Sequence, residues 1–395
     1  MFNKQTVKDV DVKGKRVLVR VDFNVPLQEG SVADDTRTRA ALPTLRYLVD
    51  HGAKVIVISH LGRPKGEPNP KYSLRPVRRS LERLLGRNVV FVEGTIDQNA
   101  FDAVERMVDG EIIMLENVRF CAGEEKNDVE FARKLSQLAD IYVNDAFGAA
   151  HRAHASTAGV AEYLPSYAGL LLAREVLTLT SMLSEPEKPF VAILGGSKVS
   201  DKFGVIDRLI DVVDVLLIGG GMAFTFLAAK GLGIGTSIVE EDWIESAKLT
   251  LQKAKKSGCE LVLPVDFIVA DAFAEDANTR VVGREEIPAD MMGLDIGPAT
   301  CELFKSDIAM AKTIFWNGPM GVFEMKSYET GTREVAEAVA RNNRAVSVIG
   351  GGDSVAAVKK FHLEDRVTFV STGGGASMKL LEGAPLPGVE ALLDA

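Results

Sequence analysis

Two lysines four residues apart follow an apolar run that ends in adjacent glycines. The stretch reads LGGSKVSDK over residues 194–202, and its cations are Lys198 and Lys202. Glycine lets backbone N–H groups approach an anion, and nearby ammonium groups neutralise its charge, so the stretch predicts phosphate binding. It differs from the usual phosphate loop, GxxxxGK followed by Ser or Thr, because its lysines come late. If Ser200 caps the next helix, Lys202 lies in the first turn, where a cation is disfavoured unless a polyanion binds.

Four strand-to-helix junctions in the second half of the chain carry glycine pairs or triplets. They read LGGSK, IGGGMAF, IGGGDSV and STGGGAS. One such junction is weak evidence, because tight turns use glycine for structural reasons, but four in one half favour a nucleotide phosphate at the helix N-termini. Asp353, in GGGDS, is either a helix N-cap or a carboxylate for nucleotide-bound Mg²⁺. Because Asp353 adjoins a glycine turn suited to phosphate, we favour the role in magnesium binding.

Charged and polar side chains follow the strands of the first half instead. They are Asp22, Asn24, His60, Arg63, Arg119, His151, Arg152 and His154. Convergent guanidinium groups hold carboxylate and phosphate by paired hydrogen bonds, so this half predicts a site for a small anion. Arg37 and Arg39 are also explained by surface salt bridges with the adjoining aspartates. The histidine spacing fits no metal motif, which favours hydrogen bonding to an anion or to backbone.

Short apolar runs alternate with amphipathic stretches along nearly the whole chain. This pattern predicts an α/β fold of βαβ units with parallel sheets, in which ligands bind beyond the carboxyl ends of the strands. We expect strands at residues 16–21, 54–59, 89–93, 111–115, 141–145, 190–194, 215–219, 261–270, 313–318, 345–350 and 367–371. Most of the candidate residues above follow one of these strands.

Length and composition predict an ordinary globular protein of two domains. The chain has 395 residues, of which 46% are hydrophobic. The polar segment SEPEKP places a boundary near residues 184–189, although a surface loop inside one large sheet is an alternative. The formal net charge of −9 argues against a nucleic acid or a membrane surface as partner. Cys121, Cys259 and Cys301 form no CxxC pair, and the N-terminus lacks the apolar segment of a secretory signal, so we expect reduced thiols and a cytoplasmic protein.

Motifs along the whole chain identify a family. In order, they are RVDFNVP, DDTRTRAALPT, SHLGRP, ENVRF, NDAFGAAHRAHAST, GGSKVSDK, GGGMAFTF, GLDIGP, WNGPMGVFE, GGGDS and STGGGASMKLLEG. With them the sequence closely resembles the phosphoglycerate kinases over essentially its full length. The resemblance implies reversible phosphoryl transfer from 1,3-bisphosphoglycerate to MgADP, which gives 3-phosphoglycerate and MgATP in glycolysis and gluconeogenesis. It also implies a monomer without nucleic-acid or membrane partners.

The same resemblance implies two doubly wound, Rossmann-like domains joined by an interdomain helix and hinge. Residues 1–170 would bind 3-phosphoglycerate, 171–185 would form the helix, and 186–377 would bind the Mg-nucleotide. The tail from about 378 to 395 would return to the first domain. With one substrate on each domain, catalysis would require domain closure.

The resemblance also implies roles for individual residues. The 3-phosphoglycerate site would comprise Asp22, Phe23, Asn24, Arg37, His60, Leu61, Gly62, Arg63, Arg119 and Arg152. The nucleotide site would comprise Lys202, Gly219, Gly220, Gly293, Leu294, Asn317, Pro319, Glu324, Gly351, Gly352, Asp353 and Ser354, with Asp353 as the Mg²⁺ ligand. We expect the transferring group to be stabilised by Arg37, Lys198, Lys202 and the backbone N–H groups of Gly351, Gly352, Gly373 and Gly374.

An acyl-phosphate kinase needs no general base, because the attacking oxygen of ADP or of a carboxylate is already ionised. The sequence agrees, since it shows neither a Ser-His-Asp nor a Cys-His arrangement for covalent catalysis. A nicotinamide-dependent oxidoreductase is one alternative, because glycine-ended strands also mark dinucleotide folds, but the GxGxxG spacing is missing. A catalytically inactive nucleotide-binding regulator is another, although its anion-site residues should then be replaced, and all of them are present.

Overall fold

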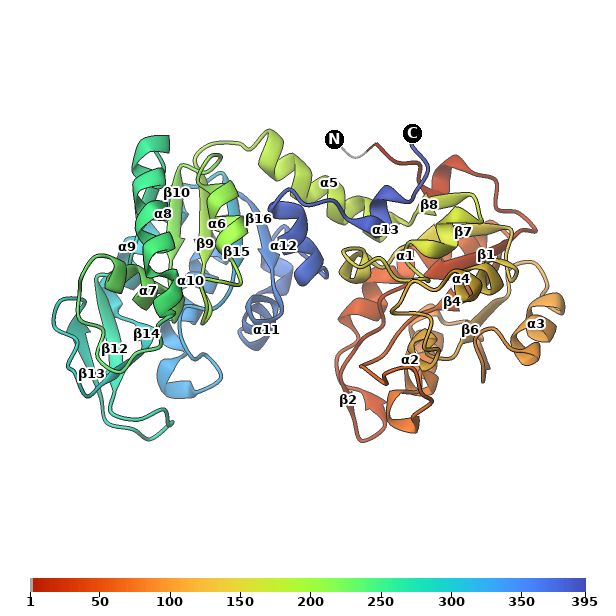
Figure 1. Ribbon diagram of the computed structural model, residues 1–395, viewed down its shortest axis with the longest axis horizontal. Coiled ribbons are helices and arrows are strands. Elements are labelled where there is room, and N and C mark those ends of the chain that lie inside the picture. Colours follow the sequence, from red (N-terminus) through yellow and green to blue (C-terminus); the bar gives the residue numbers. More distant parts are fainter. Residues whose placement is uncertain (1–2) are drawn as a thin grey trace. The chain divides into compact units, whose positions relative to one another are not determined.

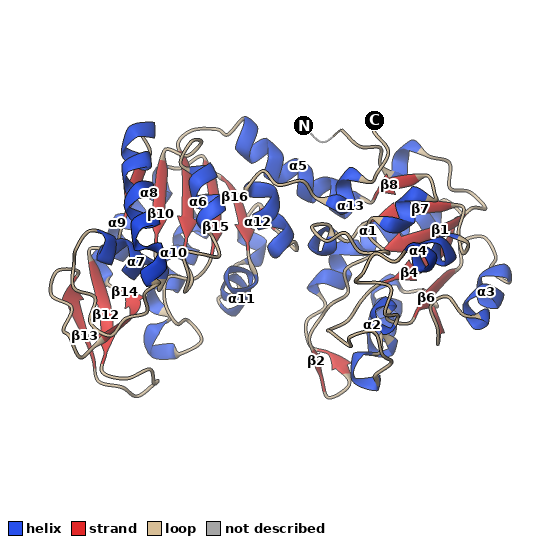
Figure 2. Cartoon of the chain, viewed as in Figure 1, coloured by secondary structure: helices blue, strands red, loops and turns tan. Residues whose placement is uncertain are grey.

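The computed structural model describes residues 3–395, and the chain divides into two compact units. Unit 1 comprises Met1–Thr180 and Ala384–Ala395, and unit 2 comprises Ser181–Gly383. The chain passes from one unit to the other within a single helix, α5 (Leu170–Ser184). Each unit contains a six-stranded parallel sheet flanked by helices (Figure 1, Figure 2), which confirms the predicted α/β class.

The sheet of unit 1 has the strand order β5-β6-β4-β1-β7-β8, and every neighbouring pair is parallel. Its strands are β1 (Arg16–Arg20), β4 (Lys54–Ile58), β5 (Val90–Val92), β6 (Ile112–Leu115), β7 (Ile141–Asn144) and β8 (Ser166–Ala168). All five strands expected in this half are present. The sequence does not predict β8, because its three residues, SYA, form no apolar run.

The helices of unit 1 begin and end at residues suited to those positions. They are α1 (Thr36–Asp50), α2 (Arg75–Leu85), α3 (Gln98–Glu105), α4 (Val129–Ser136) and α13 (Pro387–Glu390), and a hairpin of β2 (Leu27–Gln28) and β3 (Ser31–Val32) precedes α1. Asp97 and Asp128 cap α3 and α4 by accepting backbone N–H groups at 3.0 and 2.8 Å. Gly86 ends α2 in the left-handed conformation that glycine adopts without strain.

The C-terminal segment belongs to unit 1 and lies beside β8 (Figure 1). Lys4 Nζ donates to Leu392 O at 2.9 Å and forms an ion pair of 2.7 Å with Asp394. Leu393 N–H donates to Ser166 O at 3.0 Å, which attaches the segment to the edge strand of the sheet. These bonds join the two ends of the described chain.

The sheet of unit 2 has the order β11-β10-β9-β15-β16-β17, again with parallel neighbours. Its strands are β9 (Phe190–Leu194), β10 (Val215–Ile218), β11 (Glu260–Val262), β15 (Thr313–Asn317), β16 (Val346–Gly350) and β17 (Phe369–Val370). Its helices are α6 (Phe203–Leu209), α7 (Met222–Ala229), α8 (Ile244–Ser257), α9 (Pro298–Met310), α10 (Thr330–Arg341), α11 (Gly352–Lys360) and α12 (Gly375–Leu381). No helix within residues 3–395 is long and apolar enough to cross a membrane.

One sequence prediction in unit 2 is wrong. Residues 261–270, expected as one strand, form the end of β11 and the separate strand β12 (Asp266–Ala270). Pro264 lies between them and has no N–H to donate to a ladder, so the chain leaves the parallel sheet there. β12 pairs instead with β13 (Thr279–Gly283) and β14 (Met292–Ile296) in a small antiparallel sheet that the sequence does not predict.

Candidate active site

Strand register brings the glycine junctions of unit 2 to one edge. Leu194 of β9 pairs with Ile218 of β10 on one side and with Asn317 of β15 on the other, and Asn317 pairs with Gly350 of β16. The segments that follow these four residues therefore start side by side at the carboxyl edge of the sheet. Strand order also changes direction at β9, which is where open parallel sheets bind ligands.

Lys202 is held at this edge by Asn317. Its Nζ donates to Asn317 Oδ1 at 2.6 Å and to Asn317 O at 2.8 Å. Gly195 N–H donates to the same carbonyl at 3.0 Å. Gly318 is required here, because its φ is +98° and a Cβ would collide with Lys202 Nζ and Gly195 O. The loop after β9 and the loop after β15 are thus packed directly against each other.

Neither Ser200 nor Asp353, the two possible N-caps that the sequence offers, caps a helix. Lys202 itself occupies the N-cap position of α6, and Ser200 donates its hydroxyl to Glu240 Oε1 at 2.5 Å instead of capping the helix. Gly351 is the N-cap of α11, and Asp353 lies in the first turn without capping it. The capping explanation for Asp353 is therefore wrong, and its exposed carboxylate lines a cavity.

A small polar cavity lies among the glycine junctions. Its volume is about 290 Å³, and it is lined by Gly196, Ser197, Lys198, Asp201, Lys202, Asn317, Gly318, Gly351, Gly352, Asp353, Ser354, Gly374, Gly375 and Met378. Asn317 Nδ2 is buried and has no hydrogen-bond partner within the described residues, so it is a donor available to a ligand. Ser354 Oγ accepts Gly318 N–H at 2.5 Å and fixes the turn between the two loops.

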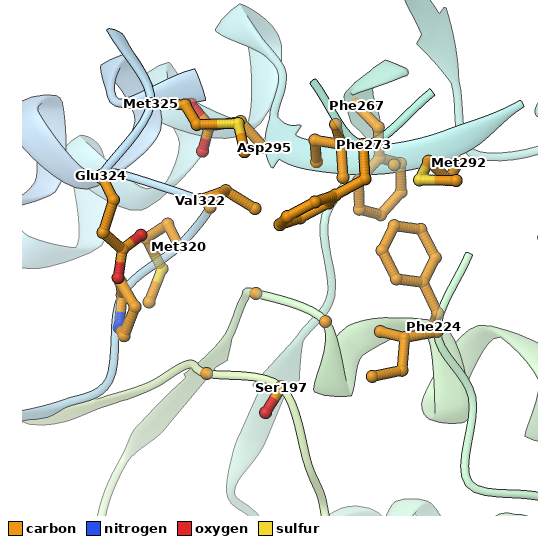
Figure 3. Close-up of a pocket in the computed structure, with 18 of the residues that line it drawn as sticks. Ser197, Phe224, Phe267, Phe273, Met292, Asp295, Met320, Val322, Glu324 and Met325 are labelled. Atoms are coloured by element: carbon orange, nitrogen blue, oxygen red, sulfur yellow. The ribbon is translucent and has the colours of Figure 1, made fainter. Parts of the chain in front are cut away.

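A larger, mostly apolar cavity adjoins the small one, and Gly196, Ser197 and Asp353 line both. It measures about 730 Å³ and includes the predicted residues Gly220, Gly293, Leu294, Pro319 and Glu324. Figure 3 shows three phenylalanines on one side, with Met320 and Glu324 on the other. A flat aromatic base suits such a cavity, and a polyphosphate suits its polar neighbour.

Sequence reasoning missed the aromatic wall and included two residues that line neither cavity. Phe224, Phe267 and Phe273 supply the wall, and only Phe224 stands in a motif that signalled the site, GGGMAF. Gly219 is buried against Met320, and Gly373 N–H donates to Ser371 Oγ at 3.1 Å. Their contribution is therefore to the shape of the junctions.

The protonation of Lys202 gives a first testable prediction. Burial lowers the pKa of Lys202 to about 8, and Asp353 and Asp201 partly oppose this effect. Because the ammonium form is the one that attracts phosphate, we expect kcat/KM for the nucleotide to fall as pH rises through about 8. A bound polyanion favours the charged form, so kcat should fall only at higher pH. Steady-state pH profiles of kcat/KM and of kcat measure both decreases.

A Lys198→Ala variant is the control for this prediction. Its kcat/KM should still fall as pH rises through about 8, and a profile without that decrease would contradict the assignment to Lys202.

In unit 1, register likewise gathers the charged residues. Arg20 of β1 pairs with Ile58 of β4 and with Asn144 of β7, so the segments after these strands share one edge. A chain of bonds follows this edge. It consists of Arg37 Nη1 to Asp22 Oδ2 at 3.0 Å, Arg37 Nη1 to Asn24 O at 3.3 Å, Gly62 N–H to Asn24 Oδ1 at 2.9 Å and Arg119 Nη1 to Gly62 O at 2.8 Å.

Arg119 is the residue at this edge that is best placed to donate hydrogen bonds to an anion. Its side chain is only 2% exposed, and Nη2 has no hydrogen-bond partner within the described residues. Its Nε lies 3.3 Å from Glu125 Oε1, which only partly balances the charge. A buried guanidinium with an unused nitrogen is costly unless an anion occupies the site. The geometry therefore favours a carboxylate or phosphate at this position.

Three buried residues behind this edge, Arg20, Ser156 and Glu124, were not predicted. Arg20 is fully buried; its Nε donates to Ser156 Oγ at 2.8 Å, and its Nη2 lies 3.0 Å from His60 Nδ1. Ser156 in turn donates its hydroxyl to Glu124 at 2.6 Å. Burial raises the pKa of Glu124, and the charge of Arg20 is the main opposing effect. An arginine inside the apolar run RVLVRV was the available signal for this network.

The remaining predicted residues of unit 1 differ in exposure. The side chains of Phe23 and Leu61 are buried in the core, so only their backbone groups can meet a ligand. Arg63 is exposed, and Arg152 Nε lies 3.2 Å from His151 Nε2. His154 is buried, and burial with nearby arginine charges lowers its pKa to about 4.

We expect His60 to remain neutral across the working pH range. Burial and the charges of Arg20, Arg119, Arg152 and Arg37 lower its pKa well below the ordinary histidine value. Arginine can only donate, so Nδ1 accepts from Arg20, and Nε2 carries the ring proton as a donor. Ring resonances assigned with a His60→Gln variant should therefore not titrate between pH 8 and about 6. A midpoint near 6.5 would contradict this arrangement.

Known proteins resemble this chain over nearly its whole length. A family model described as phosphoglycerate kinase matches residues 7–384. A phosphoglycerate kinase of Rubrobacter xylanophilus is 57% identical over 391 residues, which cover 99% of this chain and 98% of that protein. Solved phosphoglycerate kinases from Coxiella burnetii and Pyrococcus horikoshii OT3 match with TM-scores of 0.88 and 0.85 and identities of 42% and 32%, each over 98% of both chains. Neither alternative function is supported.

Proposed function

Because the chain belongs to the phosphoglycerate kinase family, we propose that each unit holds one substrate of the reaction. The chain is a phosphotransferase of glycolysis with a carboxyl group as acceptor. The assignment of one substrate to each unit rests on the contrast between the two sheet edges. One bears a buried arginine with an unused nitrogen, and the other bears glycine turns, a buried lysine and an adjoining apolar cavity.

Unit 1 binds 3-phosphoglycerate or 1,3-bisphosphoglycerate in this proposal. Arg119 Nη2 and the Nε2–H of His60 donate to the anion, and Arg63 and Arg152 add charge from the rim. Asp22 and Asn24 hold Arg37 and Gly62 in place, as their bonds of 3.0 and 2.9 Å indicate. Arginine suits both anionic groups of the substrate, because its planar fork makes paired hydrogen bonds.

Unit 2 binds ADP or ATP in this proposal. The base occupies the apolar cavity between Phe224 and Pro319, the ribose reaches Glu324, and the phosphates enter the polar cavity beside Lys202. Asn317 Nδ2 supplies a donor that otherwise has no partner within the described residues. Residues that line both cavities explain how one ligand spans them.

A Mg²⁺ ion fits the polar cavity when it arrives with the nucleotide. Mg²⁺ is typically bound by one or two carboxylates together with substrate phosphates and waters. Asp353 supplies one exposed carboxylate at the cavity, and the described residues contain no cluster of three or more His, Cys, Asp or Glu that could hold a metal by themselves. The ion would neutralise phosphate charge, and Asp353 is the residue that would hold it.

The residues of the two units then stabilise the moving phosphoryl group without a general base. The nucleophile, an ADP oxygen or a carboxylate, is already ionised, so the protein aligns the reactants and neutralises charge on the equatorial oxygens. We assign this role to Lys202 and Arg37, with Lys198 and the N–H groups of Gly351, Gly352 and Gly374 in support, whereas the N–H of Gly373 is already bonded to Ser371 Oγ. The three described cysteines form no disulfide, which suits a reducing compartment, and we propose a cytoplasmic monomer.

One experiment tests this function directly. The protein is mixed with MgATP and 3-phosphoglycerate, and any acyl phosphate is trapped with hydroxylamine. We expect a hydroxamate that depends on both substrates. A signal no higher than that of a protein-free blank would refute the proposal.

Substrates on different units must also be brought together. Reacting atoms need to approach to about 3 to 3.5 Å, and water that would hydrolyse the acyl phosphate has to be excluded. We therefore expect the radius of gyration from small-angle X-ray scattering to fall when both ligands saturate the protein. The same measurement with each ligand alone is the control, and an unchanged radius in the ternary complex would argue against closure.

A further inference from the structure

Glu240 contacts the lysine-bearing stretch 195–202 from another part of unit 2. Its Oε2 accepts Ser200 N–H at 3.0 Å, and its Oε1 accepts the Ser200 hydroxyl at 2.5 Å. Burial acts to raise the pKa of Glu240, but hydrogen bonds from Ser200 and Val199 and the charge of Lys198 outweigh it and lower the pKa. Three donors of one turn thus converge on a single ionised carboxylate.

Glu240 is itself fixed to the wall of the nucleotide-base cavity. Its N–H donates to Oγ1 of Thr225 at 3.2 Å, and Thr225 is buried in α7. Ile238, two residues earlier, lines the 730 Å³ cavity, and Ser237 Oγ accepts Gly293 N–H at 2.9 Å. The segment 237–240 therefore connects the base cavity at one end with the lysine-bearing turn at the other.

We propose that Glu240 is a positioning residue that directs Lys198 and Lys202 toward the nucleotide phosphates. Ser200 stands midway between the two lysines, and Lys202 N–H donates to Val199 O at 3.0 Å. The two hydrogen bonds from Ser200 to the Glu240 carboxylate act as a clamp, because they fix this turn and so orient the chain on both sides of it. A carboxylate suits the task because it only accepts hydrogen bonds, whereas an amide would turn its NH₂ group toward one of the donors. This inference rests on the proposed roles of the two lysines.

The test is a Glu240→Gln variant assayed for both substrates. We expect kcat to fall roughly tenfold, which is about the effect of losing one hydrogen bond to a charged group. The KM for the nucleotide should rise, because the lysines lose their fixed direction. The KM for 3-phosphoglycerate should stay within about twofold of the wild-type value, because that substrate is assigned to unit 1.

An Asp214→Asn variant is the matched structural control. Asp214 also bonds a backbone group with its carboxylate, since its Oδ2 accepts Phe190 N–H at 2.8 Å, but at the amino end of β9, opposite the lysine-bearing turn. Both variants should lower the midpoint of thermal unfolding. Only Glu240→Gln should lower kcat. Equal effects of the two variants on kcat, or none for Glu240→Gln, would overturn the inference.

Two further variants separate the possible failures. Ser200→Ala removes the 2.5 Å bond alone, and combined with Glu240→Gln it should reduce kcat by less than the product of the single effects. Independent effects would count against a clamp, and Ser200→Ala alone carries the test if the glutamine variant does not fold. Lys202→Ala is measured in parallel. If it retains normal turnover, the proposed role of the lysine fails; if it loses turnover while Glu240→Gln keeps it, only the positioning role fails.

Discussion

Replacing Lys202 with alanine lowers turnover a hundred- to thousandfold, because one charged contact to a transition state is worth about 3 to 4 kcal/mol. Asn317 fixes the ammonium through bonds of 2.6 and 2.8 Å. An ammonium carries three N–H donors, so one is left for the phosphoryl group. With its pKa near 8, the side chain is mostly charged at neutral pH. Initial rates of ATP formation from 1,3-bisphosphoglycerate measure the effect.

Lys198 is the matched comparison for this prediction. It lines the same 290 Å³ cavity from the same loop, but its side chain is exposed, so solvent already screens its charge. We expect Lys198→Ala to lower turnover only about tenfold. Lys202→Arg should not restore activity, because the position beside Gly318 is already crowded. A Lys202→Ala enzyme that keeps more than a tenth of normal turnover would refute the assignment.

The sequence could predict the glycine junctions because local pattern determines them. Each follows a short apolar run and precedes an amphipathic stretch, and all four occur as strand, turn and helix. That they meet at one edge follows from strand register, as Asn317 between Leu194 and Gly350 illustrates. Register in a parallel sheet depends on crossover helices and packing, so a single sequence does not determine it.

Contacts between distant segments were the part that could not be predicted. Ser200 is a good N-cap residue, but its hydroxyl donates to Glu240, forty residues later, and the helix starts three residues beyond Ser200, at Phe203. The aromatic wall depends on Phe267 in β12, whose antiparallel partners follow no βαβ pattern. Arg20 was missed for a different reason. Its strand was predicted correctly, but only the contacts of its guanidinium with Ser156 and His60 show that its charge lies behind the anion site.

Replacing Arg37 with alanine should lower kcat about a hundredfold or more, with a smaller change in the KM for 3-phosphoglycerate. Arg37 lies in the first turn of α1, where Asp22 and the Asn24 carbonyl both hold Nη1, at 3.0 and 3.3 Å. These two hydrogen bonds orient the guanidinium, and its remaining N–H groups can then donate to the phosphoryl oxygens on which charge develops. Steady-state kinetics in both directions separates kcat from KM.

Arg39 provides the control on the same helix. It stands two residues later and therefore does not share a face with Arg37, and it pairs with Asp35 at 2.7 Å with more than half of its side chain exposed. Arg39→Ala should leave kcat within about twofold, since exposed ion pairs of this kind contribute about 0.3 to 0.5 kcal/mol to stability. Arg37→Lys should recover only part of the loss, because an ammonium keeps the charge but not the planar pair of donors. If Arg37→Ala raised KM and left kcat unchanged, Arg37 would bind the substrate without stabilising the transfer, and the charge on the phosphoryl group would have to be met by unit 2 alone.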